Sequence, residues 1–355
     1  MIRLCLLAAG VAALAAVQPA REFETLPFAP KHAICYRAAA SLNVDGRLDE
    51  AAWRAAPWTE AFVDIEGDVR PKPRLLTRVK MLWDDEYFYF GADLEEPDLW
   101  GTYTERESVI FHENDFEVFI DPDGDTHEYY ELELNALNTV WDLMLVKPYR
   151  DGGPALNAWD IAGLKTATYL RGTLNRPGDK DEGWSIEIAM PWKILKEAAP
   201  GQRPPKAGEY WRVNFSRVQW ALDVKDGRYV KRTDPKGQPL TENNWVWSPQ
   251  GAINMHMPER WGYVQFSSRV AGTGSEDFVV GPDEQVKWAL RRIYYRQADL
   301  HKAKGRYART LRELGSDLPP VEGLELHATD HLYVITAPGK GGVVHMRQDG
   351  RVWTK

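Results

Sequence analysis

The feature that most constrains this chain is a succession of short runs rich in Val, Ile, Phe, Tyr and Trp, separated by clusters of Gly, Pro, Asp and Asn. Such runs are typical of β-strands joined by turns, and no helical period of useful length interrupts them before about residue 268. The clearest pair, residues 77–83 and 87–94, alternates in polarity on both sides of a turn at residues 84–86. The sequence therefore predicts a mainly β fold, an antiparallel β-sandwich over residues 21–267.

The remaining strands of this sandwich follow from the same pattern. Single helical turns are expected at residues 48–53 and 191–195. Further strands are predicted at residues 116–120, 130–135, 141–146, 164–170, 184–190, 210–220 and 261–266.

A change of composition predicts a second, smaller module at the C-terminus. Small polar residues interrupt the aromatic pattern and predict a linker at residues 268–282, across which few contacts are expected. Residues 283–355 then read as a helix from 284 to 314, broken near Gly305, followed by a small β-sheet. The segment 305–311 before this sheet resembles the globular half of type IV pilin-like proteins. That resemblance implies an assembly role, with a cell-surface or protein partner.

The N-terminus has the pattern of a secretory signal peptide. Arg3 precedes an apolar run from Leu4 to Val17 that ends in small residues, so residues 1–20 are expected to be removed on export. The run is shorter than a membrane span, so we expect no retained membrane anchor. Cys5 would leave with the signal, and Cys35 alone cannot form an internal disulfide. A secreted protein, in a bacterial periplasm or at the cell surface, is predicted.

Net charge and aromatic content limit the classes of molecule that this chain is expected to bind. The formal net charge of −8 makes nucleic acid a poor candidate. The chain contains 15 Trp, 15 Tyr and 11 Phe, an unusual aromatic load. Most of these rings are expected to fill a core, and some are expected to serve recognition.

One face of the predicted sandwich is polar. Side chains alternate along a strand, so Glu131, Glu133 and Asn135 share one face, while their neighbours point to the other. Glu117 and Phe119 likewise share a face, and antiparallel pairing would join the two into one shelf of carboxylates and amides. Such groups suit sugar hydroxyls, although a plain solvated outer face has the same pattern.

Aromatic side chains near this shelf sharpen the prediction of a sugar site. A pyranose ring offers an apolar face to a flat side chain while its hydroxyls reach polar neighbours. Trp141 begins its strand beside Asn138, and Trp159 lies in a Gly-bounded loop, although core packing would explain either ring. The predicted sugar-binding residues are Phe111, Glu117, Glu131, Glu133, Asn135, Trp141, Trp159, Trp247 and His256.

Three motifs in order resemble carbohydrate-binding module family 9, over roughly residues 40–267. They are Asp45-Gly46-x-Leu48-Asp49-Glu50-x-x-Trp53, Val79-x-x-x-Trp83-Asp84-x-x-Tyr87-x-Tyr89-x-x-Ala92 and Glu117-x-Phe119-Ile120-Asp121. The later segments Trp184-x-x-Glu187-x-x-x-Pro191-Trp192, Asn214-x-Ser216-Arg217 and Trp245-x-Trp247-Ser248-Pro249 resemble the secreted bacterial members of this group. The resemblance implies a non-catalytic sandwich that binds sugars or glycan chain ends between two tryptophans, with bound calcium, in polysaccharide catabolism.

The resemblance carries over to individual residues only in part. It places Phe111 where the family has a ligand-stacking tryptophan, with Glu117 and Asn135 as its polar partners. The family's arginine corresponds to Glu133, and its second tryptophan falls near Met255 and His256. The two-tryptophan clamp is therefore missing, and Trp159 or Trp247 would have to supply a ring from another loop.

The loop at residues 121–128 is a candidate calcium site. It carries the predicted ligands Asp121, Asp123, Asp125 and Glu128, and Gly124 allows a sharp turn. A complete EF-hand loop would need a glutamate where Leu132 stands, so a looser structural site or an ordinary acidic turn remains.

Two other functions compete with sugar binding. Glu131 and Glu133 stand about 6.6 Å apart along one strand, near the carboxylate separation of inverting glycoside hydrolases, but on the same side of any ligand. Haem binding is the other alternative, because Met255, His256 and Met257 offer axial ligands.

Overall fold

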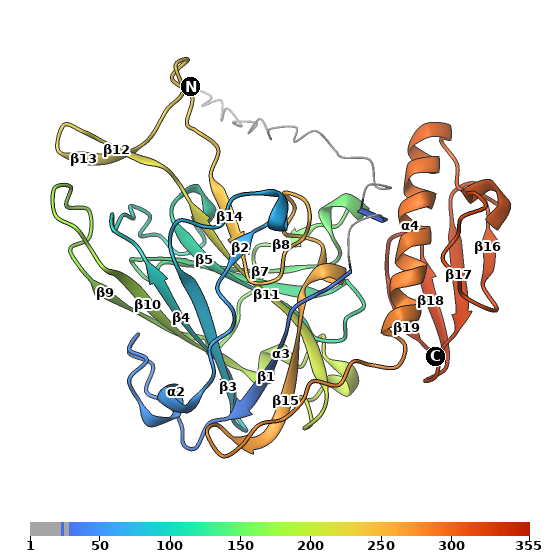
Figure 1. Ribbon diagram of the computed structural model, residues 1–355, viewed down its shortest axis with the longest axis horizontal. Helices are drawn as coiled ribbons and strands as arrows, with labels where there is room; N and C mark the ends of the chain where they lie inside the picture. The colour runs from blue at the N-terminus through green and yellow to red at the C-terminus, as the bar shows by residue number, and fades with distance from the viewer. Residues whose placement is uncertain (1–22, 25–27) are drawn as a thin grey trace, which may run out of the picture.

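The computed structural model describes residues 23–24 and 28–355 as a large β-structure beside a smaller unit of one helix on a sheet (Figure 1). The predicted signal peptide, residues 1–20, and Cys5 lie outside the described residues. No helix in the described part of the chain combines the length and the apolar character that a membrane crossing requires. Cys35 is fully buried, which raises the pKa of its thiol.

The large β-structure is one thirteen-stranded sheet, and a separate hairpin is formed by β12 (Leu222–Lys225) and β13 (Arg228–Lys231). In the sheet, β14 (Asn243–Val246) pairs with β11 (Tyr210–Gln219), and β2 (Val63–Asp64) pairs with β14. The main path runs in the order β8 (Ala155–Leu156), β7 (Val140–Leu145), β6 (Tyr129–Asn135), β5 (Asp115–Asp121), β11 (Tyr210–Gln219), β15 (Gly262–Val270), β1 (His32–Arg37), β3 (Thr77–Trp83), β4 (Tyr87–Glu95), β10 (Gly183–Pro191) and β9 (Lys165–Arg171).

The sheet folds over itself, so its two halves face each other as a sandwich. Phe90 on β4 and Phe215 on β11 are far apart in the strand order, yet their ring centroids are 5.6 Å apart. Inward residues of both halves form one buried cluster, including Val79, Ile186 and Leu132. The predicted mainly β sandwich is confirmed.

The prediction that all strands are antiparallel is wrong at one place. Strand β1, which the strand assignment missed, pairs in parallel with both β15 and β3 and so joins the two halves. Its partners are β15, the last strand of the sandwich, and β3. Parallel strands are joined by long connections and not by a tight turn, so no local turn signal marks these pairings in the sequence. The hairpin of β3 and β4 has the predicted bounds within one residue and pairs Trp83 with Phe88.

The first family-like motif builds the frame of the fold. The carboxylate of Glu187 on β10 accepts hydrogen bonds from the backbone N–H groups of Asp45 and Gly46, each at 2.8 Å, and from Trp53 Nε1 at 2.5 Å. Gly91 lies beneath this turn, where any Cβ would approach Leu48 to 2.7 Å. Short helices α2 (Ala51–Ala55) and α3 (Trp192–Leu195) lie where helical turns were expected.

The C-terminal unit consists of helix α4 (Glu284–Lys304) packed on a four-stranded sheet (Figure 1). The helix ends at Gly305, whose φ of 69° provides a left-handed cap, as the sequence suggests. Its buried side chains and those of the sheet form a second core, to which Met257 of the sandwich contributes. The sheet order is β16 (Glu325–Ala328), β17 (Tyr333–Pro338), β18 (Val343–Arg347) and β19 (Val352–Thr354).

Buried polar contacts join the two units, contrary to the expectation of few contacts. Arg212 on β11 pairs with Glu284 of α4 at 3.1 Å, and both side chains are buried. Arg351 Nε donates to Asp125 at 2.6 Å from the other end of the unit. The composition of the connecting residues 271–283 does not indicate whether residues far apart in the sequence form ion pairs between the two units. The division into domains stays a prediction.

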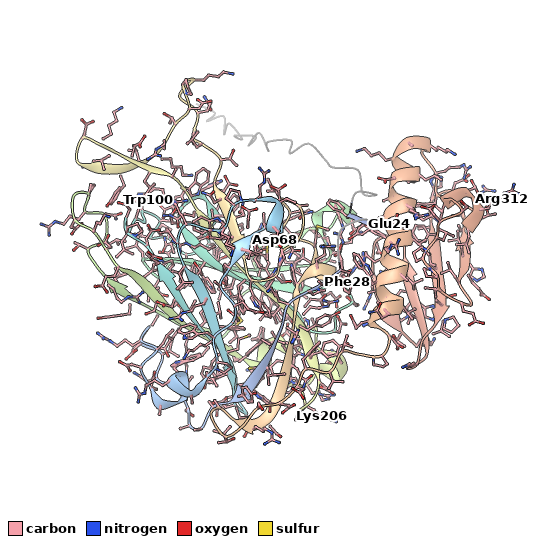
Figure 2. The ribbon with its side chains drawn as sticks, in the orientation of Figure 1. Glu24, Phe28, Asp68, Trp100, Lys206 and Arg312 are labelled. Carbon is pink, nitrogen blue, oxygen red and sulfur yellow. The ribbon has the colours of Figure 1, made fainter. Side chains whose placement is uncertain are left out.

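A residue near the N-terminus of the described chain also contacts α4. Figure 2 labels Glu24 beside this helix, where its carboxylate accepts hydrogen bonds from Arg296 Nε at 2.7 Å and from Arg292 at 3.2 Å. Because Glu24 is buried, these two cations offset the cost of removing its charge from water.

Candidate functional site

Strand alternation gathers acidic side chains on the outer face of β5 and β6. In the register of β5 and β6, Glu117 lies directly opposite Glu133, and Phe119 lies opposite Glu131. Trp141 on β7 lies opposite Glu133 on its other side. Their neighbours in sequence point into the core of the sandwich. The predicted polar shelf is therefore present in the structure.

This shelf is the floor of a cavity of about 560 Å³ rather than an open surface. Three polypeptide segments wall it: the 3-10 helix η2 (Ile110–His112), the turn at Tyr149, and the segment before the 3-10 helix η5 (Pro258–Arg260). Six of the predicted sugar-binding residues meet here, namely Phe111, Glu117, Glu131, Glu133, Trp141 and His256. The other lining residues are Ile65, Phe119, Tyr149, Val218, Glu242, Asn244, Ile253, Asn254 and Met255.

Two aromatic rings lie side by side at the mouth of the cavity. Phe111 and Trp141 have ring centroids 6.4 Å apart and planes within 29° of parallel. Phe111 keeps 37% of its surface exposed, although it is a large apolar side chain. Its backbone N–H donates to Glu133 at 3.0 Å, so a floor carboxylate also holds the ring in place. Such rings are available to an apolar ligand face.

The floor is crowded with carboxyl groups that resist ionisation. Burial, the largest cause, and the charge of Glu242 together raise the pKa of Glu117 to about 7. Burial, and then the charge of Glu117, raises the pKa values of Glu131 and Glu133. Asp115, at the end of the same face, behaves likewise. Like charges directly opposite on neighbouring strands repel, so proton uptake by these carboxyl groups lowers the electrostatic repulsion between them.

His256 forms a neutral part of the wall. Burial and the nearby Arg150 lower the pKa of its imidazole to about 3. Its Nδ1 lies 3.0 Å from Tyr129 Oη, and its ring meets Tyr149 edge to face at 4.6 Å. Met257 is fully buried in the second core. Of the three residues proposed as haem ligands, Met255 and His256 line the cavity and Met257 does not.

Three of the predicted sugar-binding residues do not reach the cavity. Asn135 is fully buried, and its amide donates to Tyr103 O at 2.9 Å while its carbonyl accepts from the turn that follows β6. Trp159 stacks at 4.8 Å on Tyr130, which points to the core. Trp247 is also in the core, where Gly262 makes room for its ring. Alternation places a strand residue on a face but does not reveal whether loops cover it.

The acidic loop after β5 brings together three of its four predicted metal ligands. Carboxylate oxygens of Asp121, Asp123 and Asp125 lie within 4.8 Å of one another, while Glu128 is exposed and outside this group. Asp121 accepts backbone N–H groups of the loop at 3.0 and 2.9 Å. Arg351 occupies one oxygen of Asp125, so the remaining oxygens fit a cation only in part.

Much of the cavity wall has no signal in the sequence. Tyr149, which is half exposed, and Glu242 belong to connections between strands, where no periodicity marks a side chain for an inward role. Asn244 lies on β14 and Asn254 in the loop before His256. Trp245 and Trp247, the tryptophans of the family-like pattern beside Asn244, are buried.

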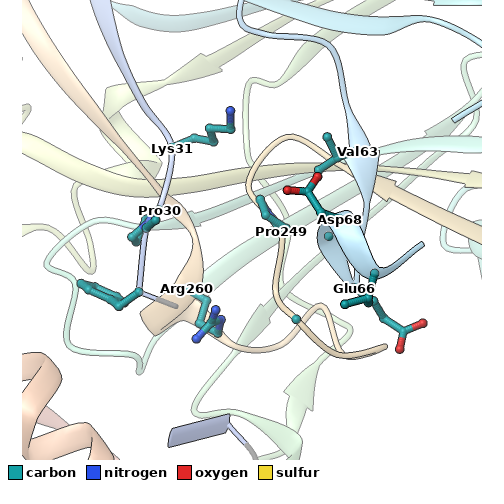
Figure 3. Close-up of a pocket in the computed structure, with 12 residues that line it drawn as sticks. Pro30, Lys31, Val63, Glu66, Asp68, Pro249 and Arg260 are labelled. Carbon is teal, nitrogen blue, oxygen red and sulfur yellow. The ribbon is translucent and has the colours of Figure 1, made fainter. Parts of the chain in front are cut away.

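A second cavity, of about 390 Å³, opens beside the first residues of the sandwich (Figure 3). Pro30, Val63 and Pro249 point toward it, with Glu66 and Asp68 at its border. Its walls are mostly apolar, and among the described residues that line it Lys31 and Arg260 supply the positive charge. It lacks the paired rings and the carboxylate floor of the first cavity.

The described chain thus combines a β-sandwich with an acidic cavity on one of its outer faces. Residues 44–204 match the family model described as "Carbohydrate family 9 binding domain-like". The resemblance to carbohydrate-binding module family 9 that the sequence motifs indicate is thereby confirmed for this region, and the matching family consists of binding domains rather than enzymes. The matched region contains the floor of the cavity and both rings at its mouth, but not the wall at residues 242–256.

Curated relatives match the chain over a short region. Exoglucanase XynX of Acetivibrio thermocellus is 30% identical over 117 residues, which is 33% of this chain and 9% of the relative. Endo-1,4-beta-xylanase A of Thermoanaerobacterium saccharolyticum is 29% identical over 117 residues, or 8% of its length. The chain thus matches less than a tenth of the length of these two proteins.

Solved structures with similarity to the chain include a family 9 carbohydrate-binding module from Caldicellulosiruptor kristjanssonii in complex with cellotriose. It is 15% identical with a TM-score of 0.42, over 69% of this chain and 99% of the module. The same module in complex with glucose covers 67% of this chain at the same TM-score.

Proposed function

We propose that this protein binds carbohydrate without cleaving it, in the cavity between Phe111, Trp141 and the carboxylate floor. The single observation that supports this most strongly is the lining of this cavity, where two rings within 29° of parallel accompany buried carboxyl groups that can bond hydroxyls. Such a mixture fits a sugar ring, whose apolar face needs a flat surface and whose hydroxyls need acceptors. The family match at residues 44–204 supports the same class of ligand.

The arrangement of the acids favours binding over hydrolysis. Glycoside hydrolysis needs two carboxyl groups that flank the scissile bond. Here Glu117, Glu131 and Glu133 lie side by side on two neighbouring strands, and thus on one side of any ligand. A role in polysaccharide catabolism after export, suggested by the signal-like N-terminus and by the names of the relatives, is part of this proposal.

The test is a calorimetric titration of the full chain with a panel of neutral oligosaccharides. Phe111→Ala and Trp141→Ala should each weaken binding by roughly thirtyfold, about 2 kcal/mol, because a stacking ring at the centre of a site contributes most. Trp353→Ala is the matched control, since this ring stacks on His345 in the C-terminal sheet. Unchanged binding in folded Phe111→Ala and Trp141→Ala variants would disprove this placement of the site.

Chromatography of the same mixtures separates binding from hydrolysis. A binding domain leaves every oligosaccharide intact. A hydrolase would release shorter products, and Glu131→Gln or Glu133→Gln would abolish that release while largely sparing binding.

A further inference from the structure

The described ionisable side chains that line the cavity include four glutamates and no lysine or arginine. Glu117, Glu131, Glu133 and Glu242 line it, and none of its lining residues in the described chain is a lysine or an arginine. The nearby cation Arg150 is already bound to Glu259, at 2.8 Å. A neutral sugar leaves these acids protonated, whereas a cation placed among them favours their ionised form and can bond to it.

Two carboxyl oxygens on this face have no partner. Glu131 Oε2 and Asp115 Oδ2 are buried, and no group within the described residues forms a hydrogen bond with them. A buried polar atom without a partner costs about 1 to 3 kcal/mol, so a ligand that supplies a donor here recovers that cost. Glu131 lines the cavity, and its side chain is only 5% exposed. It is therefore an acceptor that a ligand can reach only by entering the cavity.

The cavity walls also favour positive charge. A cation within about 6 Å of an aromatic ring is attracted to the ring face. The paired rings of Phe111 and Trp141, with the half-exposed Tyr149, surround the acidic floor. An ammonium group on a sugar ring would therefore meet carboxylates below and aromatic faces at its side.

We propose that the cavity selects sugars that carry a free amino group, of the glucosamine type, over neutral, N-acetylated or acidic sugars. The inference rests on the proposed function, because it names the substrate class of the same site. An ammonium donates charge-assisted hydrogen bonds, which are roughly twice as strong as neutral ones, and it compensates carboxylates that repel each other. A uronate or sulfated sugar would add negative charge to this floor and is rejected.

The test compares three trimers of the same β-1,4 linkage that differ only at carbon 2: the glucosamine trimer, its fully N-acetylated form, and cellotriose. Calorimetry on the full chain near pH 6 keeps the amines protonated. The glucosamine trimer should bind about tenfold or more tightly than the other two. Glu131→Gln and Glu133→Gln, which keep side-chain shape, should remove this preference, so that the affinity ratio of the glucosamine trimer to cellotriose falls from about tenfold to about one.

Two further variants make the result specific. Glu242→Gln neutralises a half-buried acid of the cavity wall and should reduce the preference without touching the buried floor. Glu322→Gln removes the same charge from an exposed site in the C-terminal unit and should leave the preference intact. Loss of the preference in Glu322→Gln would trace it to net charge and overturn the inference.

The outcomes separate the two proposals. If cellotriose binds as tightly as the glucosamine trimer and Phe111→Ala still weakens both, the amino-sugar inference is wrong and the sugar-binding function stands. If none of the trimers binds, both proposals are wrong. A divalent cation that binds in a Glu131-dependent manner while no amino sugar does would also overturn the inference.

Discussion

Neutralising Glu117 should change how the stability of this protein depends on pH. Glu117 is buried, and this burial, together with the nearby charge of Glu242, raises its pKa from 4.5 to about 7. The folded protein therefore holds a proton that the unfolded chain releases. Stability from this group is fully present below about pH 4.5 and is lost as the pH rises through about 7.

The size of the effect follows from the two pKa values. Each pKa unit corresponds to about 1.4 kcal/mol, and integration between pH 5 and pH 8 gives a loss of roughly 2 to 3 kcal/mol from Glu117 alone. Glu117→Gln keeps the shape of the side chain and abolishes its titration. The unmodified chain should therefore lose this amount of stability between pH 5 and pH 8, and the variant should not. The free energy of unfolding of the variant, relative to that of the unmodified chain, should rise by the same amount over this pH range.

Urea unfolding at pH 5, 6, 7 and 8, followed by tryptophan fluorescence, measures this difference. Glu322→Gln is the control, because the same change at an exposed site should leave the pH profile parallel to that of the unmodified chain. If the Glu117→Gln profile is also parallel, the floor carboxyl groups are not strained by ionisation, and the electrostatic account of the cavity is wrong.

Two further predictions concern the acidic loop and the contact between the units. We propose that Asp121, Asp123 and Asp125 hold calcium, so a chelator should lower the melting temperature of the unmodified chain but not of Asp123→Asn, and equal sensitivity in both would place the ion elsewhere. Glu284→Ala should destabilise the fold by about 3 to 5 kcal/mol, because it leaves the buried Arg212 without its partner; an unchanged urea midpoint would show that water reaches this contact.

Local patterns were enough to predict most strands and the polar face. Alternation put Glu131 and Glu133 on the side opposite Leu132, and the structure has them there. Turn residues located the hairpin of β3 and β4 to within one residue. These features depend on neighbours in sequence, which is the range over which periodicity carries information.

Features that depend on distant segments were not predictable in this way. Strand β1 pairs with β15, more than 200 residues away along the chain, and a single sequence gives no sign of that register. Asn135 and Trp247 carry side chains typical of sugar sites, yet neighbouring turns and strands bury both. The type of a residue indicates which chemistry it can perform, whereas its exposure is set by the segments that fold over it.

The wall of the cavity depends on the C-terminal unit, which explains why local reasoning missed it. His256 is followed directly by Met257, whose side chain packs in the core of the helix and its sheet. Two residues later, Glu259 accepts hydrogen bonds from Tyr295 of α4 at 2.6 Å and from Arg150 at 2.9 Å. Arg150 adjoins Tyr149 in the neighbouring wall, and the Tyr149 ring contacts His256 edge to face at 4.6 Å. Both walls are therefore anchored to α4 through one buried carboxylate, whose pKa the guanidinium of Arg150 lowers to about 2 despite burial. The strands supply the acidic floor, and the second unit fixes the two walls that turn this floor into a cavity.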